Sequence, residues 1–231
     1  MSEILAILRS AWAIARKDWQ SEFRSKEILF TMGFFGLLVV LISAFAFFRG
    51  DVPAYAIASG TLWVAIAYSG TLGLGRAFER EREGDCIRAL LLSPTPRPAI
   101  YLGKLLGIVS FMLLVELLVV PAVVIFFNQS LGFDQLWRLG LVMTLGTLGY
   151  GIVGTALAAS LLRARTKDVL LAIVIYPVIV PVIMGGVKAT TAILQPSMSI
   201  VDFELWARIL FVFDVVFMVV SLWIFEPLLL D

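Results

Sequence analysis

The side chains that could carry out chemistry are few in this sequence. Its 231 residues include no histidine and one cysteine, Cys86. An imidazole base or metal ligand, an internal disulfide and a CxxC motif are therefore excluded. Paired carboxylates, a Ser/His pair and a metal-ligating cluster do not occur at useful spacings, so the sequence does not favour an enzyme. We expect this chain to bind no metal ion or cofactor.

Two carboxylates lie within apolar sequence and are the remaining candidates for a functional role. Glu116 stands near the middle of an apolar run, where a charge is costly and usually faces protein or water. It could line a translocation path or act in gating, or it could form a hydrogen bond between packed helices. Asp214 lies near the start of another apolar run and is expected to be interfacial.

The composition places these residues in a lipid bilayer. Hydrophobic residues make up 61% of the chain and charged residues 15%, with a mean hydropathy of +0.99. These values lie outside the range of soluble domains. A helix needs about 20 residues to cross the hydrocarbon core. We read six spans, at residues 28–48, 54–74, 102–127, 139–162, 169–184 and 209–230.

The fifth span is the least regular of the six. Pro177 and Pro181 interrupt it, and Gly185 and Gly186 are expected to close it early. The two prolines predict a kink or a break, which could serve as a hinge in gating or be only a bend. Five spans with a re-entrant fifth segment are the alternative to six.

Basic residues predict the orientation, since short loops rich in Lys and Arg stay in the cytoplasm. Fourteen of the 18 fall on one side: Arg9, Arg16, Lys17, Arg24, Lys26, Arg76, Arg80, Arg82, Arg88, Arg97, Lys104, Arg163, Arg165 and Lys167. Both termini are therefore placed in the cytoplasm. The net charge of +1 gives no reason to expect nucleic acid as a partner.

Residues 1–27 have the pattern of an amphipathic helix in the membrane interface. The apolar residues recur every three or four positions, and the charged residues fall largely between them. The apolar positions are Ile4, Leu8, Trp12, Ala15, Trp19 and Phe23. The helix could act as an anchor that sets topology, or it could have a mechanical role.

Small residues recur at intervals along the fourth span. They favour close helix packing in lipid, either within one subunit or at a seam between two subunits. The glycines concerned are Gly140, Gly146, Gly149, Gly151 and Gly154.

The most polar stretch of the chain, residues 79–98, reads EREREGDCIRALLLSPTPRP. If the second span is a helix from Ala54 to Glu83, it reaches about 45 Å, well beyond a hydrocarbon core of about 30 Å. Its last turns must then stand in the cytoplasm.

The residues that follow predict a short helix beyond this extension. Gly84 is expected to end the long helix, and Asp85 to cap a short helix through Leu92. The proline-rich stretch 94–98 then forces an extended return to the third span. So short a helix is marginal in water and needs a surface, either the membrane interface or a soluble partner.

The stretch FEREREGDCIRALLLSPTPRPAIYLGK, residues 78–104, resembles the cytoplasmic coupling segment of ABC-2 type transporter permeases. Within that superfamily the chain is most similar to the haem exporter protein B family (CcmB) of cytochrome c maturation. RKDWQSEFRSKE at 16–27 and LGTLGYGIVGTALAASLLRARTKDVLLAIVIYPVIVPVI at 145–183 carry the narrower resemblance, with six spans and no large outer domain. One departure is GDCI at 84–87, where such segments usually read like GTLE.

The resemblance implies a dimer of permease copies above a separate ATPase subunit (CcmA-like), which holds ATP and magnesium. It agrees with the sequence, since Gly103 and Lys104 are followed by Leu105 and form no phosphate-binding loop. The coupling residues implied are Glu79, Glu81, Arg82, Gly84, Asp85, Ile87, Arg88, Leu90, Leu91 and Pro94.

The resemblance also implies that haem is handled by partner proteins, a membrane protein (CcmC-like) and a small membrane subunit (CcmD-like). The complex would then drive release of a haem-loaded carrier rather than direct passage of haem. Cys86 could be a lone haem thiolate ligand, although an ordinary cytoplasmic cysteine is the simpler interpretation.

These observations predict an all-α, six-span permease of the bacterial inner membrane. Its parts are an interfacial helix at 1–27 and a permease domain at 28–231 that includes the coupling segment 79–98. An ABC-2 permease for a lipid, drug or polysaccharide is one alternative. A membrane scaffold that recruits a cytoplasmic partner without transport is the other.

Overall fold

The computed structural model describes residues 2–47, 52–83, 96–161 and 167–228 and is helical apart from its connections. Within these ranges there is no strand and there are seven long helices. They are α1 (Ser2–Ser25), α2 (Glu27–Ala46), α3 (Ala54–Glu83), α5 (Arg97–Phe126), α6 (Phe133–Ser160), α7 (Lys167–Leu194) and α8 (Ile200–Leu228).

Six of these helices, α2, α3 and α5 to α8, are long and apolar enough to cross a membrane. The prediction of an all-α, multi-pass membrane protein with six spans is confirmed. The helix α3 also runs without a break for 30 residues from Ala54 to Glu83, as the predicted extension beyond the hydrocarbon core requires. The helices α6 and α8 begin several residues earlier than the apolar runs indicated.

The prediction that the fifth span closes at Gly185 and Gly186 is wrong. The helix α7 is continuous to Leu194 and contains Pro177 and Pro181, so a short re-entrant segment is contradicted too. Without water in the hydrocarbon core, a chain that leaves the helix exposes unsatisfied backbone groups, which favours continuing it. The two glycines instead admit neighbouring side chains, with Leu210 against Gly185.

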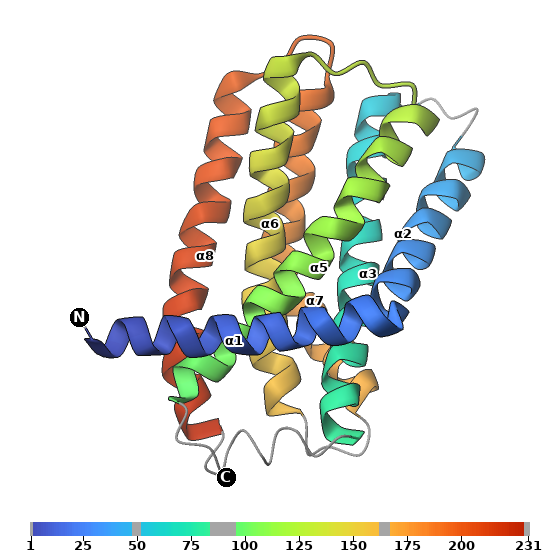
Figure 1. Cartoon of the computed structure of the whole chain (residues 1–231). Helices are drawn as coiled ribbons and strands as arrows, with labels where there is room; N and C mark the ends of the chain where they lie inside the picture. The colour runs from blue at the N-terminus through green and yellow to red at the C-terminus, as the bar shows by residue number, and fades with distance from the viewer. Residues whose placement is uncertain (1, 48–51, 84–95, 162–166, 229–231) are drawn as a thin grey trace.

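Figure 1 shows how the helices are arranged. The helices α3, α6, α7 and α8 stand roughly side by side, α2 leans outward at one edge, and α5 crosses the front of the bundle at a slant. The helix α1 lies across the bundle near the end where α3 and α8 finish and α5 begins, and it packs on α5. The helix α6 contacts α3, α5, α7 and α8. Four of its five predicted packing glycines, Gly146, Gly149, Gly151 and Gly154, are buried at the centre of the packing, whereas Gly140 is exposed.

A tryptophan forms the tightest contact of this core. The Trp63 indole of α3 lies between Gly146 of α6 and Gly186 of α7, where any added methyl group would overlap the ring. Its Nε1 donates a 3.0 Å hydrogen bond to Thr190 Oγ1. In lipid, helices associate through such close packing and interhelical hydrogen bonds, so this contact fixes three spans against one another.

Candidate functional site

The N-terminal helix crosses α5 at very short range. A Cβ atom at Gly103 would lie 2.7 Å from Ile14 Cβ and 2.8 Å from the Ala11 carbonyl oxygen. Ala11 and Ile14 are both buried. Glycine at 103 therefore sets the depth at which α1 rests on α5.

Charged and polar side chains of α1 and α5 form further contacts at this crossing. Lys104 Nζ lies 2.6 Å from Asp18 Oδ2, and the two side chains are only 7% and 18% exposed. Lys17 approaches the other carboxylate oxygen of Asp18 at 3.1 Å. Nearly two turns of α5 further on, Trp19 Nε1 donates a 2.7 Å hydrogen bond to Ser110 Oγ. We call the contact of Ala11, Ile14, Asp18 and Trp19 with α5 the α1–α5 joint.

The buried face of α1 includes only part of the apolar stripe that the sequence suggested. Ala15 of that stripe is buried and Trp19 bonds to Ser110, whereas Leu8, Trp12 and Phe23 are exposed. Ala11 and Ile14, which lie outside the suggested stripe, are buried as well. The exposed apolar residues are free to contact lipid, as an interfacial helix requires. A second stripe, which joins small and acidic residues, makes the contact with the bundle.

A buried carboxylate holds the corner between α1 and α2. Glu22 Oε1 accepts a 2.9 Å hydrogen bond from the backbone N–H of Leu29, and Glu22 is buried. Lys26, between the helices, has a left-handed backbone with φ of 57°. Glu22 thus takes the place of a side chain at the N-cap of α2 and fixes the angle of the corner.

Arg76 connects the lower part of α3 to the same corner. Its Nη1 lies 3.4 Å from Glu27 Oε1 at the start of α2 and 3.6 Å from Glu79 Oε2 on its own helix. All three side chains are well exposed, so each pair is weak alone. They place the start of the coupling segment beside the start of α2.

Most of the predicted coupling residues lie outside the part of the chain that the structure describes. Glu79 has a described side chain, while Glu81 and Arg82 are described only as part of the α3 backbone. The others lie outside the described residues altogether: Gly84, Asp85, Ile87, Arg88, Leu90, Leu91 and Pro94.

Glu116 lies between α5 and α6. The Thr147 hydroxyl of α6 donates a hydrogen bond to its Oε1, and the residue is 5% exposed. Its Oε2 has no hydrogen-bond partner among the described residues. The structure therefore brings Glu116 into an interhelical hydrogen bond and leaves half of its carboxyl group unsatisfied.

Asp214 is not interfacial, contrary to the sequence interpretation. Because α8 begins at Ile200, Asp214 lies in the middle of the helix and is buried against Gly149. Neither of its carboxylate oxygens has a hydrogen-bond partner within the described part of the chain. Glu116 of α5 contacts Thr147 of α6, and Asp214 of α8 lies against Gly149 of α6. These two positions of α6 face in nearly opposite directions, so the two acids lie on different sides of α6.

The remaining predicted positions are distributed around α6 and α7. Gly151 faces Val109 of α5, and Gly154 faces Leu74 of α3. Pro177 and Pro181 are exposed on the outer surface of α7, away from Glu116. The predicted gating residues therefore do not form one site within a single copy of the chain.

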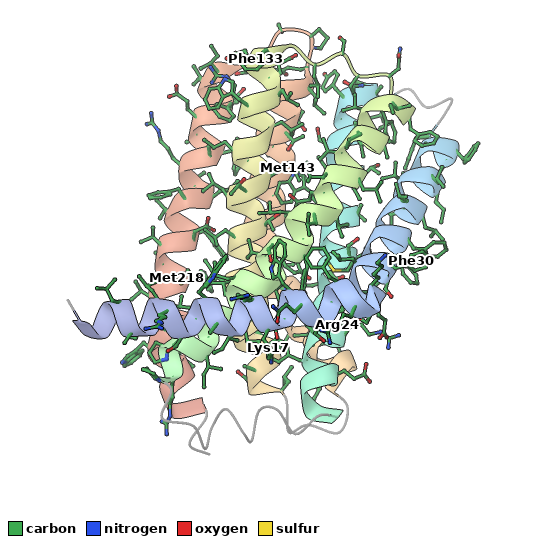
Figure 2. All side chains as sticks on the ribbon, in the orientation of Figure 1. Lys17, Arg24, Phe30, Phe133, Met143 and Met218 are labelled. Carbon is green, nitrogen blue, oxygen red and sulfur yellow. The ribbon has the colours of Figure 1, made fainter. Side chains whose placement is uncertain are left out.

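A groove of about 590 Å³ runs between α5 and α6. Figure 2 shows Met143 beside this gap and Phe133 at the end of the bundle far from α1. Trp19 of the α1–α5 joint lines the groove as well. Its lining residues are Trp19, Ser110, Leu113, Leu114, Glu116, Leu117, Val120, Pro121, Leu136, Leu139, Gly140, Met143 and Thr144.

Sequence reasoning missed the α1–α5 joint. Its signal was present in the spacing of Ala11, Ile14, Asp18 and Glu22, which lie on one face of a helix. Two acids on that face, in a segment otherwise rich in basic residues, indicate a buried cationic partner. Only the fold identifies that partner as Lys104.

Comparison with known protein families assigns the chain to one of them. The family described as CcmB protein matches residues 9–226, nearly the whole sequence. This chain belongs to the CcmB family. The match includes both α1 from Arg9 onward and all of residues 79–98, the predicted coupling segment.

Two CcmB relatives illustrate the extent of the similarity. Heme exporter protein B of Haemophilus influenzae is 29% identical over 175 residues, which cover 74% of this chain and 76% of the relative. Heme exporter protein B of Escherichia coli K12 is 33% identical over 99 residues, or 42% of this chain. That alignment spans 44% of the relative, less than half of its length. The CcmB assignment thus rests on the family match rather than on one relative.

Proposed function

We propose that this chain is the permease subunit of an ABC transporter in cytochrome c maturation, located in the inner membrane of a bacterium. The observation that carries the proposal is the match of residues 9–226 to the CcmB family. Its relatives named heme exporter protein B occur in Escherichia coli and Haemophilus influenzae. Both termini lie in the cytoplasm, because the basic residues gather on that side.

The energy for the cycle comes from a separate ATPase subunit, which holds ATP and magnesium. The length of α3, 30 residues or about 45 Å, supports an extension that reaches such a subunit below the membrane. Residues 85–92 form the contact, with Ile87, Leu90 and Leu91 as apolar anchors. Charged neighbours such as Arg88 provide charge complementarity to the ATPase subunit around these anchors.

The geometry around the coupling segment supports a mechanical role for α1. Arg76 links the lower part of α3 to the start of α2, and Glu22 fixes α2 to α1. The Asp18–Lys104 pair then links α1 to α5, whose N-terminus receives the returning coupling segment. A force on residues 79–98 therefore reaches three spans, α2, α3 and α5, together with the interfacial helix α1.

Haem is the cargo of the system but is held by its partners, a CcmC-like membrane protein and a CcmD-like small subunit. The groove between α5 and α6 supports this division. Its lining contains no basic side chain for a haem propionate. The sequence also has no histidine for an axial ligand. The cycle of this permease therefore releases a haem-loaded carrier, and two permease copies act together.

Retention of the ATPase by the permease tests the proposal. Leu90→Glu and Leu91→Glu each place a charge on an apolar anchor, which costs on the order of 2 kcal/mol in binding. We expect the Kd of the CcmA-like ATPase for the folded permease to rise about thirtyfold, and the ATPase recovered per folded permease to fall accordingly. Leu8→Glu is the control, because Leu8 is an exposed apolar residue of α1.

A segment that only rests on lipid gives a different result. The leucine variants would then insert poorly or lose stability in detergent, while the ATPase retained per folded permease stays constant. Retention of the ATPase by both variants would show that residues 85–92 are not the coupling helix.

A further inference from the structure

The fold separates the charges of α1. Residues 5–25, the part of α1 whose side chains are described, contain two acids. Asp18 pairs with Lys104 at the crossing with α5, and Glu22 is buried at the corner with α2. The basic side chains of the same stretch are all exposed, and they are Arg9, Arg16, Lys17 and Arg24. The exposed charges of this part of α1 are therefore positive only.

The exposed surface of α1 is divided into an apolar sector and a basic sector. Successive residues of an α-helix lie about 100° apart around its axis, and we measure these angles from Asp18, which faces α5. The exposed apolar side chains occupy the sector between about 80° and 140°, and they are Leu5, Leu8, Trp12 and Phe23. Arg16 and Arg9 follow directly, at about 160° and 180°. The two arginines thus adjoin the apolar sector, on the side of α1 that faces away from the bundle.

These two arginines are available to an external partner. Neither Arg9 nor Arg16 has a hydrogen-bond or ion-pair partner among the described residues. They lie nearly on one line of the helix, about 10 Å apart along its axis, so one surface can contact both. Each guanidinium group presents five N–H donors in a planar fork, a geometry that matches the oxygens of a phosphate. The chemistry of the basic sector is therefore that of a phosphate-binding surface.

The apolar neighbours identify the source of the phosphate. Trp12 is 67% exposed and lies within about one helical turn of both arginines. Exposed tryptophan is typical of the headgroup level of a membrane, and α1 lies across the bundle near one end of the spans (Figure 1). A phospholipid offers acyl chains and a phosphate side by side, whereas a soluble acidic protein offers only the charge. In a zwitterionic lipid the cationic group cancels the charge of the phosphate, so an anionic lipid fits best.

We propose that the surface formed by Arg9, Trp12 and Arg16 binds the headgroups of anionic phospholipids in the leaflet where α1 lies. Trp12 packs among the upper parts of the acyl chains, and the two guanidinium groups donate hydrogen bonds to lipid phosphates. The bundle holds the opposite side of α1 through Asp18, so lipid and protein contact the helix from two sides. This selection of lipid goes beyond the proposed coupling to an ATPase and does not depend on it.

Quenching by spin-labelled lipids tests the proposal. The full chain with Cys86→Ser and Ala13→Cys carries a fluorophore at residue 13, an exposed position about 40–60° from the two arginines. It is reconstituted in phosphatidylcholine liposomes at low ionic strength. Phosphatidylglycerol or phosphatidylcholine, each with the same spin label near the headgroup, is then added at low mole fraction. We expect phosphatidylglycerol to associate about fivefold to thirtyfold more strongly, or about fivefold for each arginine.

Variants of exposed residues separate charge from other effects. Arg9→Gln and Arg16→Gln should each lower the preference for phosphatidylglycerol about fivefold, and the double variant should abolish it. Arg9→Lys and Arg16→Lys keep the charge and should retain most of the preference. Arg208→Gln is the matched control, because Arg208 is 79% exposed on α8, toward the end of the bundle far from α1. Added salt should weaken the preference by screening.

Four results would overturn the proposal. Equal quenching by the two lipids would show that α1 does not select anionic lipid. A preference that survives in the Arg9→Gln, Arg16→Gln double variant would place the selection elsewhere in the protein. Displacement of spin-labelled phosphatidylglycerol by inorganic phosphate, beyond the effect of chloride at the same ionic strength, would indicate a site for a soluble anion. Equal quenching together with loss of ATPase retention in the double variant would assign this surface to the ATPase subunit.

Discussion

The buried ion pair of the α1–α5 joint gives the sharpest quantitative prediction. Removing one partner of a buried pair costs about 3–5 kcal/mol, because the other charge loses its compensation. Lys104 is 7% exposed, so Asp18→Ala should loosen α1 strongly. Asp18 is 18% exposed, which places the cost at the lower end, about 3 kcal/mol. Lys104→Met should cost only about 1 kcal/mol, since Asp18 keeps Lys17 at 3.1 Å and some solvent.

Thiol labelling measures this loosening directly. Ile14 is 7% exposed on the face of α1 that packs against α5. A cysteine at this position reacts only when α1 lifts from α5. In a Cys86→Ser background, we expect labelling to become about 150-fold faster with Asp18→Ala and about fivefold faster with Lys104→Met. Leu8→Cys is the control, because Leu8 is 54% exposed and its labelling rate should not change.

The double variant completes the experiment. Asp18→Ala combined with Lys104→Met removes both charges, so its effect should be smaller than the sum of the two single effects. An acceleration of less than about tenfold for Asp18→Ala corresponds to less than about 1.4 kcal/mol. That result, or strict additivity, would refute the conclusion that the pair fastens α1 to the bundle.

Two further predictions concern packing and orientation. Gly146→Ala should lower the melting temperature in detergent by about 2–10 °C, because the methyl group overlaps the facing indole ring, while Gly60→Ala should be neutral or slightly stabilising. An unchanged melting temperature for Gly146→Ala would contradict that contact. A cysteine at Gln129 should react with an impermeant thiol reagent outside intact cells, whereas Cys86 should not. Labelling of Cys86 from outside would reverse the proposed orientation.

The sequence determined the class and the span number of this protein. Its apolar runs can satisfy their backbone groups in lipid only as helices, so six such runs predict six spans. The unbroken α3 from Ala54 to Glu83 agrees with the absence of proline between these residues. The family resemblance depended on local motifs, which a linear sequence preserves completely.

The tertiary structure decided which residue meets which. Asp18 and Lys104 are 86 positions apart, and nothing in their local sequence specifies that they pair. Gly186 looked like a helix end because glycine is a weak helix former, yet the arrival of Trp63 from α3 makes it a packing surface inside α7. Asp214 looked interfacial until the true start of α8 placed it against Gly149. Such contacts depend on how helices rotate and cross, which periodicity within one helix cannot encode.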